Sequence, residues 1–129
     1  MIVVDTNVIA YLFVPGDRTS AAEALRRRDA EWAAPLLWRS EFRNVLATLV
    51  RLERVELRIA QAIQQQAERL LAPLEFAVDS ETVLALAAGS GCSAYDCEFV
   101  ALAEYLDVPL VSADRRLKTR FVKRVRLLS

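Results

Sequence analysis

The sequence of 129 residues contains no histidine and only two cysteines. A zinc site of imidazole and thiolate ligands is therefore not expected, because Cys92 and Cys97 lack C-x-x-C spacing and no histidine can complete the ligand set. Both cysteines are predicted to be reduced core thiols of a cytoplasmic protein. Glycine (3) and proline (4) are also scarce, which excludes collagen-like and low-complexity chains.

Long hydrophobic runs are missing as well. No segment approaches the roughly 20 apolar residues that span a bilayer. The apolar start from Met1 to Val4 is ended by Asp5 and follows no basic residue, so a signal peptide is not expected. The hydrophobic fraction of 54% with 26% charged residues suits a packed core. We therefore predict a single domain over residues 1–129.

The formal net charge is zero, so no uniformly basic surface indicates a nucleic-acid-binding protein. The charges are unevenly distributed, however. Residues 115–129 contain seven basic residues and no acid, whereas the first 114 residues contain ten basic and 17 acidic residues, a net charge of −7. The basic C-terminal segment 115–129 fits either a solvated helix face or a phosphate-binding surface.

Strand and helix patterns alternate along the chain, which is typical of an α/β fold with a mainly parallel sheet. The predicted strands cover residues 2–4, 32–34, 74–78, 109–111 and 125–128. The predicted helices cover residues 8–14, 17–29, 35–52, 59–71, 80–89, 93–106 and 113–121. Thr6 is expected to cap the first helix and Ser93 the sixth.

Two carboxylates follow predicted strands. Asp5 comes directly after the first strand, and Asp114 comes just after the strand over residues 109–111. Both therefore belong to the carboxyl edge of a parallel sheet, where open α/β sheets bind ligands. Either residue could instead be a turn or helix-capping residue.

Two further carboxylates lie on predicted helices. Glu41 stands on a helical row that is otherwise apolar, with Leu37, Val45 and Leu49. Burying it unpaired would cost several kcal/mol, so it needs an arginine, a proton or a metal ion, unless the helix exposes it or supplies an ion pair. Asp96 lies in the first turn of its helix, where Ser93-x-x-Asp96 also fits a capping box.

The four acids are expected to converge, since two follow parallel strands and two lie on helices beside those strand ends. Carboxylates that lie close together cannot all stay ionised without a cation. All-oxygen ligands favour Mg²⁺ or Mn²⁺ over Zn²⁺, and such clusters serve phosphodiester cleavage. The basic segment could then hold phosphates beside the site, with Arg115, Arg116 and Lys118 as candidate RNA contacts.

Four motifs follow one another along essentially the whole chain. They are Asp5-Thr6-Asn7-Val8, Glu41 in the third predicted helix, Tyr95-Asp96-x-x-Phe99-Val100-Ala101-Leu102-Ala103, and the segment from Val108 to Leu117. In this order and spacing the motifs resemble the PIN domain, and within that family the small VapC toxins of prokaryotic toxin–antitoxin pairs.

The resemblance implies a three-layer α/β/α sandwich with a mainly parallel sheet of four to five strands. It also implies a Mg²⁺- or Mn²⁺-dependent ribonuclease that leaves a 5′-phosphate and a 3′-hydroxyl. The implied metal ligands are Asp5, Glu41, Asp96 and Asp114. Asn7 and Ser112 match polar positions that orient the carboxylates or water, although the family more often has Thr at the position of Ser112.

The partners implied by the resemblance are an RNA substrate, a second copy of the chain and an inhibitory antitoxin whose tail enters the acidic groove. Apolar residues that could contribute to such contacts gather in the middle of the chain. They are Trp32, Leu36, Leu37 and Trp38, unless these side chains fill the core.

Two other classes of function remain open. In the first, the acids cap helices or bind a structural ion, and the chain is a binding module without turnover. In the second, Asp5 forms an aspartyl-phosphate. Phosphatases of the haloacid dehalogenase type need Asp-x-Asp, where this chain has Asn7, and receiver domains need a lysine directly after a late strand. Lys118 and Lys123, the only lysines, do not follow a predicted strand directly.

Overall fold

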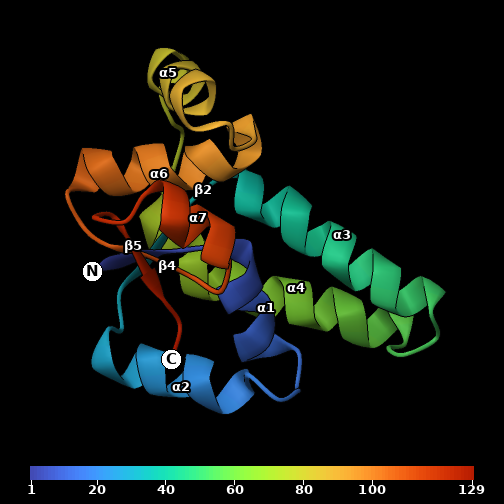
Figure 1. The fold of residues 1–129 in the computed structure, drawn as a ribbon. Helices are drawn as coiled ribbons and strands as arrows, with labels where there is room; N and C mark the ends of the chain where they lie inside the picture. The colour runs from blue at the N-terminus through green and yellow to red at the C-terminus, as the bar shows by residue number, and fades with distance from the viewer.

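The computed structural model describes all 129 residues, and a sheet of five parallel strands lies at its centre (Figure 1). The strands are β1 (Ile2–Val4), β2 (Trp32–Pro35), β3 (Glu75–Phe76), β4 (Leu110–Ser112) and β5 (Val125–Leu127). Their order in the sheet is β3-β2-β1-β4-β5. The central strand β1 is buried along its whole length, as expected of a strand covered on both faces. The predicted α/β class and parallel sheet are therefore confirmed.

Seven α-helices connect and cover the strands. They are α1 (Thr6–Phe13), α2 (Thr19–Arg28), α3 (Leu37–Arg51), α4 (Leu57–Leu71), α5 (Ser80–Ser90), α6 (Ala94–Leu106) and α7 (Arg115–Arg120), with a 3₁₀ turn η1 (Ala72–Leu74) before β3. Helices α6 and α7 lie on one face of the sheet and α1, α2 and α4 on the other (Figure 1). Right-handed crossovers between parallel strands produce this arrangement, and it gives the predicted three layers.

The start of α1 corrects one prediction. Asp5, and not Thr6, is the N-cap, because the Asp5 carboxylate accepts a hydrogen bond from the Thr6 amide at 2.8 Å. Thr6 is the first helical residue. Ser93 caps α6 as predicted, since its hydroxyl accepts from the Asp96 amide at 3.0 Å.

Tryptophan burial corrects another prediction. Trp32 is 2% exposed and Trp38 is fully buried, so both belong to the single core cluster of 28 residues. Trp32 is therefore not available as a contact surface, whereas Leu36 is 52% exposed. The buried row of α3 consists of Trp38, Phe42 and Leu46, which leaves the row that contains Glu41 at the margin of the core.

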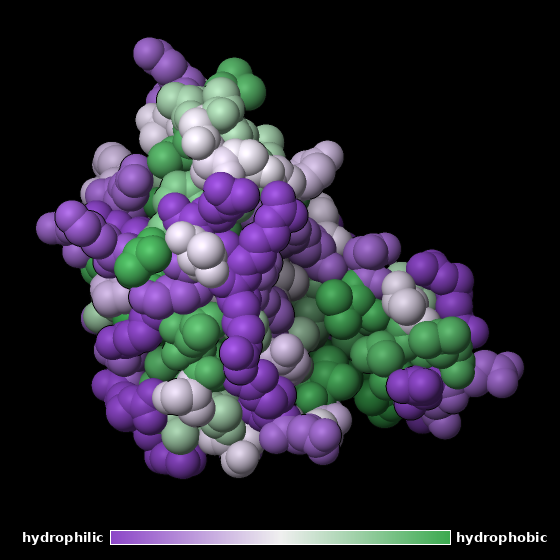
Figure 2. Space-filling view, viewed as in Figure 1, coloured by the Kyte–Doolittle hydropathy of each residue, from purple (hydrophilic) through white to green (hydrophobic).

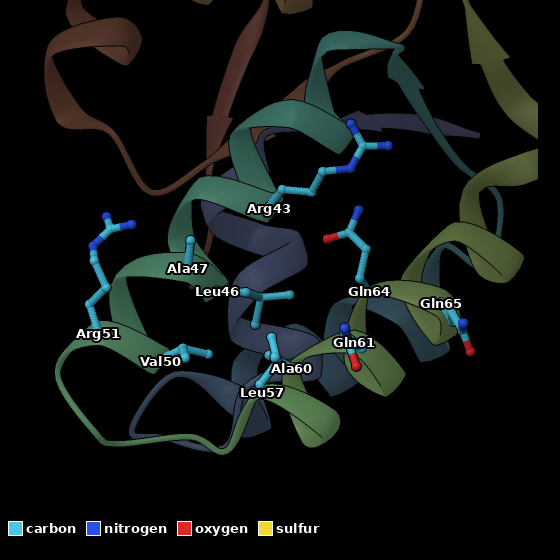
Figure 3. A pocket seen from close by; sticks show the side chains of 10 residues that line it. All are labelled: Arg43, Leu46, Ala47, Val50, Arg51, Leu57, Ala60, Gln61, Gln64 and Gln65. Carbon is cyan, nitrogen blue, oxygen red and sulfur yellow. The ribbon is translucent and has the colours of Figure 1, made fainter.

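Helices α3 and α4 pack against each other and project from the body as an arm (Figure 1). Hydrophobic side chains gather on this arm beside a hollow between the arm and the body (Figure 2). A cleft of about 570 Å³ runs between the two helices, with Leu46 and Val50 from α3 and Ala60 from α4 among its lining (Figure 3). None of the four predicted metal-binding acids lines this cleft. Along the whole fold, no helix has the length and apolar character needed to cross a membrane.

Candidate active site

The candidate site lies where the direction of the chain through the sheet reverses. From β1 the chain proceeds outward through β2 to β3, and it then returns past β1 to form β4 and β5 on the other side. The crevice at the carboxyl ends of β1 and β4 is thus the position where open α/β sheets bind ligands. Val4 pairs with Val111, and the Asp5 amide donates to the Val111 carbonyl at 3.0 Å, so Asp5 lies beside Ser112.

Asp5 is a buried carboxylate without a cationic partner. Only 8% of its surface is exposed, and its two oxygens accept from the Thr6 amide at 2.8 Å and from the Ser112 hydroxyl at 2.7 Å. Burial raises the pKa of Asp5 from 3.8 to about 6, and the charges of Asp96 and Glu41 act in the same direction. The site therefore favours a proton or a cation at Asp5.

Glu41 is half-buried and faces Asp5 from α3. Its Oε1 atom accepts from the Thr6 hydroxyl at 2.7 Å, and neither an arginine nor an intrahelical ion pair satisfies it. Burial raises the pKa of Glu41, and the nearby charges of Asp96 and Glu98 raise it further. The alternatives of an exposed Glu41 or an ion-paired Glu41 are thereby removed.

Asp96 and Asp114 complete the set from α6 and α7. The Ser93 hydroxyl binds the Asp96 amide, but no bond from the Ser93 amide to the Asp96 carboxylate completes the predicted capping box. Burial raises the pKa of Asp96, and the charge of Asp114 contributes. Asp114 caps α7, because its Oδ1 atom accepts from the amides of Arg116 and Leu117 at 2.9 and 3.2 Å.

The four acids form one electrostatically connected group. Asp96 raises the pKa of both Asp5 and Glu41, and Asp114 in turn raises that of Asp96. None of the six ion pairs of the protein involves these acids. The N-termini of α1, α6 and α7 meet at this edge, and the positive ends of their dipoles offset part of the negative charge.

The chemistry of the donor set fits a hard divalent cation. All donors are carboxylate oxygens, with no histidine and no thiolate among them, as Mg²⁺ and Mn²⁺ prefer. The side chains are not gathered around one point, since no three acids lie close enough together to surround an ion. The acids must therefore come closer together before all four can bind one ion.

Asn7 and Ser112 connect the site acids to the sheet edge. The Ser112 hydroxyl donates to Asp5 and accepts from the Asp114 amide at 3.0 Å. The Asn7 side chain donates to Ser112 at 3.4 Å and accepts from the Ala113 amide at 3.2 Å. Ser112 thus joins Asp5 to Asp114, and Asn7 joins Ser112 to the chain after β4; a role of either residue in orienting metal-binding carboxylates stays a prediction.

Sequence reasoning missed two residues near the site. Thr6 was expected only as a cap, although its hydroxyl binds Glu41. Glu98 is half-buried, its pKa is raised by burial, and its charge acts on Glu41. An acid two residues after Asp96, directly before the apolar stretch from Phe99 to Ala103, was the available signal for Glu98.

The basic segment is partly occupied by structural contacts. Lys118 donates from Nζ to the carbonyls of Val122 and Val125, both at 2.8 Å. Arg116 donates to the Gly91 carbonyl at 3.1 Å, and its charge lowers the pKa of the neighbouring Asp96. Arg115 is exposed, and its guanidinium forms no hydrogen bond or ion pair within the chain. Of the three predicted RNA contacts, Arg115 is thus the one whose charged group is free.

Known structures share this fold. The crystal structure of PAE2754 from Pyrobaculum aerophilum superposes with a TM-score of 0.79 at 21% identity, over 98% of this chain and 90% of that chain. FitAcB from Neisseria gonorrhoeae gives 0.72 at 19% identity, over 100% and 97%. A toxin–antitoxin complex from Klebsiella pneumoniae gives 0.69 at 17% identity, over 98% and 96%. None of the curated proteins matches the sequence.

A family model gives the more specific result. The model of the PIN domain matches residues 2–121, a range that includes every strand except β5 and all four site acids. Proteins of this family are typically nucleases. The chain therefore belongs to the PIN-domain family.

Proposed function

We propose that this protein is a Mg²⁺- or Mn²⁺-dependent endoribonuclease. The observation that carries the proposal is Asp5, a buried carboxylate without an ion pair at the reversal point of the sheet. Among three further acids at the same edge, Asp96 raises the pKa of both Asp5 and Glu41, and Asp114 raises that of Asp96. A site of this charge repels the phosphates of RNA unless a cation neutralises it.

In this proposal Asp5, Glu41, Asp96 and Asp114 hold the divalent ion. The ion supplies the positive charge that lets a phosphodiester approach and that lowers the barrier to its hydrolysis. Ser112 and Asn7 keep Asp5 oriented through the contacts described above. Arg115, at the start of α7, binds RNA phosphates with its free guanidinium, and Arg116 adds positive charge beside it. Hydrolysis adds water across the P–O3′ bond and leaves a 5′-phosphate and a 3′-hydroxyl.

The contacts of two residues argue against an aspartyl-phosphate enzyme. Asn7 stands where such a phosphatase has its second acid, and both ends of its amide are used by Ser112 and Ala113. Lys118, the lysine nearest to β4, donates to two carbonyls in the turn before β5 and within it. Neither residue is therefore available to act on a phosphoryl group at Asp5.

The biological setting is proposed from the neighbouring folds. One of them is a toxin–antitoxin complex, and we propose that this chain is likewise a cytoplasmic toxin with an antitoxin partner. For a homodimer, the exposed Leu36 and Leu84 supply an apolar surface, because they line a cleft of about 450 Å³ between β3, α5 and α6. The structure buries Trp32 and Trp38 away from any such contact.

The direct test is cleavage of a panel of structured and single-stranded RNAs by the purified protein in Mg²⁺, in Mn²⁺ and in EDTA. Cleavage is expected only with metal, and Asp5→Asn should abolish it. Asp107→Asn is the matched control, because Asp107 is an exposed acid that pairs with Arg124. A folded protein that binds Mn²⁺ yet cuts no RNA of the panel would favour the binding module instead.

A further inference from the structure

Thr6 connects two of the site acids through its own backbone and side chain. Its amide donates to Asp5 Oδ1 at 2.8 Å, and its hydroxyl donates to Glu41 Oε1 at 2.7 Å. Glu41 lies 35 residues away on another helix, and this bond is its only hydrogen bond from a side chain of the protein. We propose that Thr6 is a positioning residue that aims the Glu41 carboxylate at the ion; this inference rests on the proposed function.

The hydroxyl of Thr6 is itself fixed in direction. Thr6 is the first residue of α1, is only 7% exposed, and has its backbone held by the Asp5 cap. A β-branched side chain in a helix has few accessible rotamers. The hydroxyl points towards Glu41 on α3, and a short bond from a hydroxyl to a carboxylate is among the stronger hydrogen bonds of proteins.

The consequence for Glu41 is an ordered carboxylate with one oxygen left open. An ionised carboxylate only accepts hydrogen bonds, so Thr6 must supply the proton of this bond. The bond occupies Oε1 and leaves Oε2 without a protein partner. Without the hydroxyl, no side chain donates a hydrogen bond to the half-buried Glu41, so its carboxylate is free to rotate. This rotational entropy is then lost when the ion binds, which weakens binding. Residues that orient a metal ligand in this way typically contribute about 10–100-fold to metal affinity.

The test measures Mn²⁺ affinity by isothermal titration calorimetry without RNA, together with cleavage. Thr6→Val keeps the shape and removes the hydroxyl, and it should weaken Mn²⁺ binding by about 10-fold or more. Thr6→Ser restores a hydroxyl and should return the affinity to within about 3-fold of the original. Thr48→Val is the control, because the Thr48 hydroxyl on the same helix as Glu41 binds only its own helix and lies away from the site.

A double-mutant cycle separates positioning from a merely structural role. In a Glu41→Gln background, Thr6→Val should cause little further loss of Mn²⁺ affinity, because the group it orients no longer carries charge. A loss of the same size in both backgrounds, or an unchanged affinity of Thr6→Val, overturns the inference. If Thr6→Val does not fold by circular dichroism, Thr6→Ala takes its place in the cycle.

The outcomes for Thr6 and for the nuclease can be told apart. If the unsubstituted protein binds no Mn²⁺ and cuts no RNA, the proposed function fails and the inference fails with it. If the unsubstituted protein binds Mn²⁺ and cuts RNA while Thr6→Val behaves identically, only the role of Thr6 is overturned.

Discussion

Asp5 loses nearly all of its hydration when the chain folds and β1 pairs with β4. No basic side chain of the protein compensates for this loss by pairing with the carboxylate. Two hydrogen bonds, from Thr6 and Ser112, compensate only in part, because burial still raises the pKa to about 6. A buried acid of this kind destabilises the metal-free protein at neutral pH. Functional sites often contain groups that destabilise the fold locally in this way.

The first prediction concerns stability against pH. The pKa of Asp5 is about 6 in the folded protein and 3.8 as its ordinary value. Between these values the folded state binds the proton and the unfolded state does not. The contribution of Asp5 to the free energy of unfolding is therefore most favourable below pH 4. As the pH rises through 6, the free energy of unfolding falls by up to about 3 kcal/mol. In EDTA, urea unfolding should show Asp5→Asn more stable than the parent at pH 7 and equal to it near pH 4. Lower stability of the variant at pH 7 would contradict this account.

The second prediction concerns Asp96. Asp96→Asn should abolish cleavage and leave the fold intact, because the cap of α6 is made by the Ser93 hydroxyl and the Asp96 amide, which the substitution retains. Stability without metal should rise slightly, since repulsion of Asp5 and Glu41 falls. Cleavage assays and thermal unfolding measure both effects. Ser93→Ala tests the cap itself and should cost about 1 kcal/mol; unfolding of Asp96→Asn would show that its carboxylate has a capping role.

At the scale of elements, the start of α3 is anchored to β3. Arg39 binds both oxygens of Glu75 at 2.7 Å, and the Trp38 indole donates to the same carboxylate at 2.7 Å. The pKa of Glu75 is lowered chiefly by the hydrogen bond from Arg39. Because Glu41 lies two residues beyond Arg39, this anchor also determines where Glu41 meets the site.

The third prediction tests the anchor. Arg39→Met leaves the Glu75 carboxylate, whose side chain is 8% exposed, without its cation and should destabilise the protein by about 3 kcal/mol. Arg43→Met is the control, because Arg43 is exposed and its ion pair with Glu68 is long, at 3.8 Å. The control should change stability by no more than about 1 kcal/mol. Equal effects of the two substitutions in urea unfolding would mean that the Glu75 pair does not anchor α3.

The elements also show how far the sequence is informative. The positions of Asp5 and Asp114 follow from the alternation of strands and helices, because the carboxyl ends of parallel strands share one edge. The partner of Glu41 does not follow from it, since that partner depends on the rotation of α3 about its axis. Trp38 is fully buried, whereas Leu37 packs against the core only in part, and this rotation was set by tertiary packing.

At the scale of the whole molecule, the acidic body and the basic C-terminal segment are connected by specific contacts. Arg126 pairs with Asp29 at 3.5 Å, and Arg124 donates to the Val108 carbonyl at 3.1 Å. Together with Lys118 these residues hold β5 at the edge of the sheet. Charge density along the sequence could not show which basic residues are used in this way, because the contacts are made mostly with backbone carbonyls.

The fourth prediction concerns RNA binding by the free part of this segment. In an Asp5→Asn background that prevents cleavage, Arg115→Gln should weaken RNA binding and lower the slope of log affinity against log salt by about 1. Lys118→Met should instead destabilise the fold, because it removes two hydrogen bonds to backbone carbonyls. Fluorescence anisotropy at several salt concentrations measures the slope. An unchanged slope for Arg115→Gln would identify this side chain as part of a solvated face.

The central claim is that the four acids bind the ion on which RNA cleavage depends. Its most direct test is the cleavage rate of one RNA substrate as a function of Mn²⁺ concentration, with Mn²⁺ occupancy measured by electron paramagnetic resonance in the same samples. The rate should rise with occupancy, and Asp96→Asn should lower the occupancy and abolish cleavage. Cleavage that persists in EDTA, or that is unaffected when Asp96→Asn lowers the occupancy, would contradict the account.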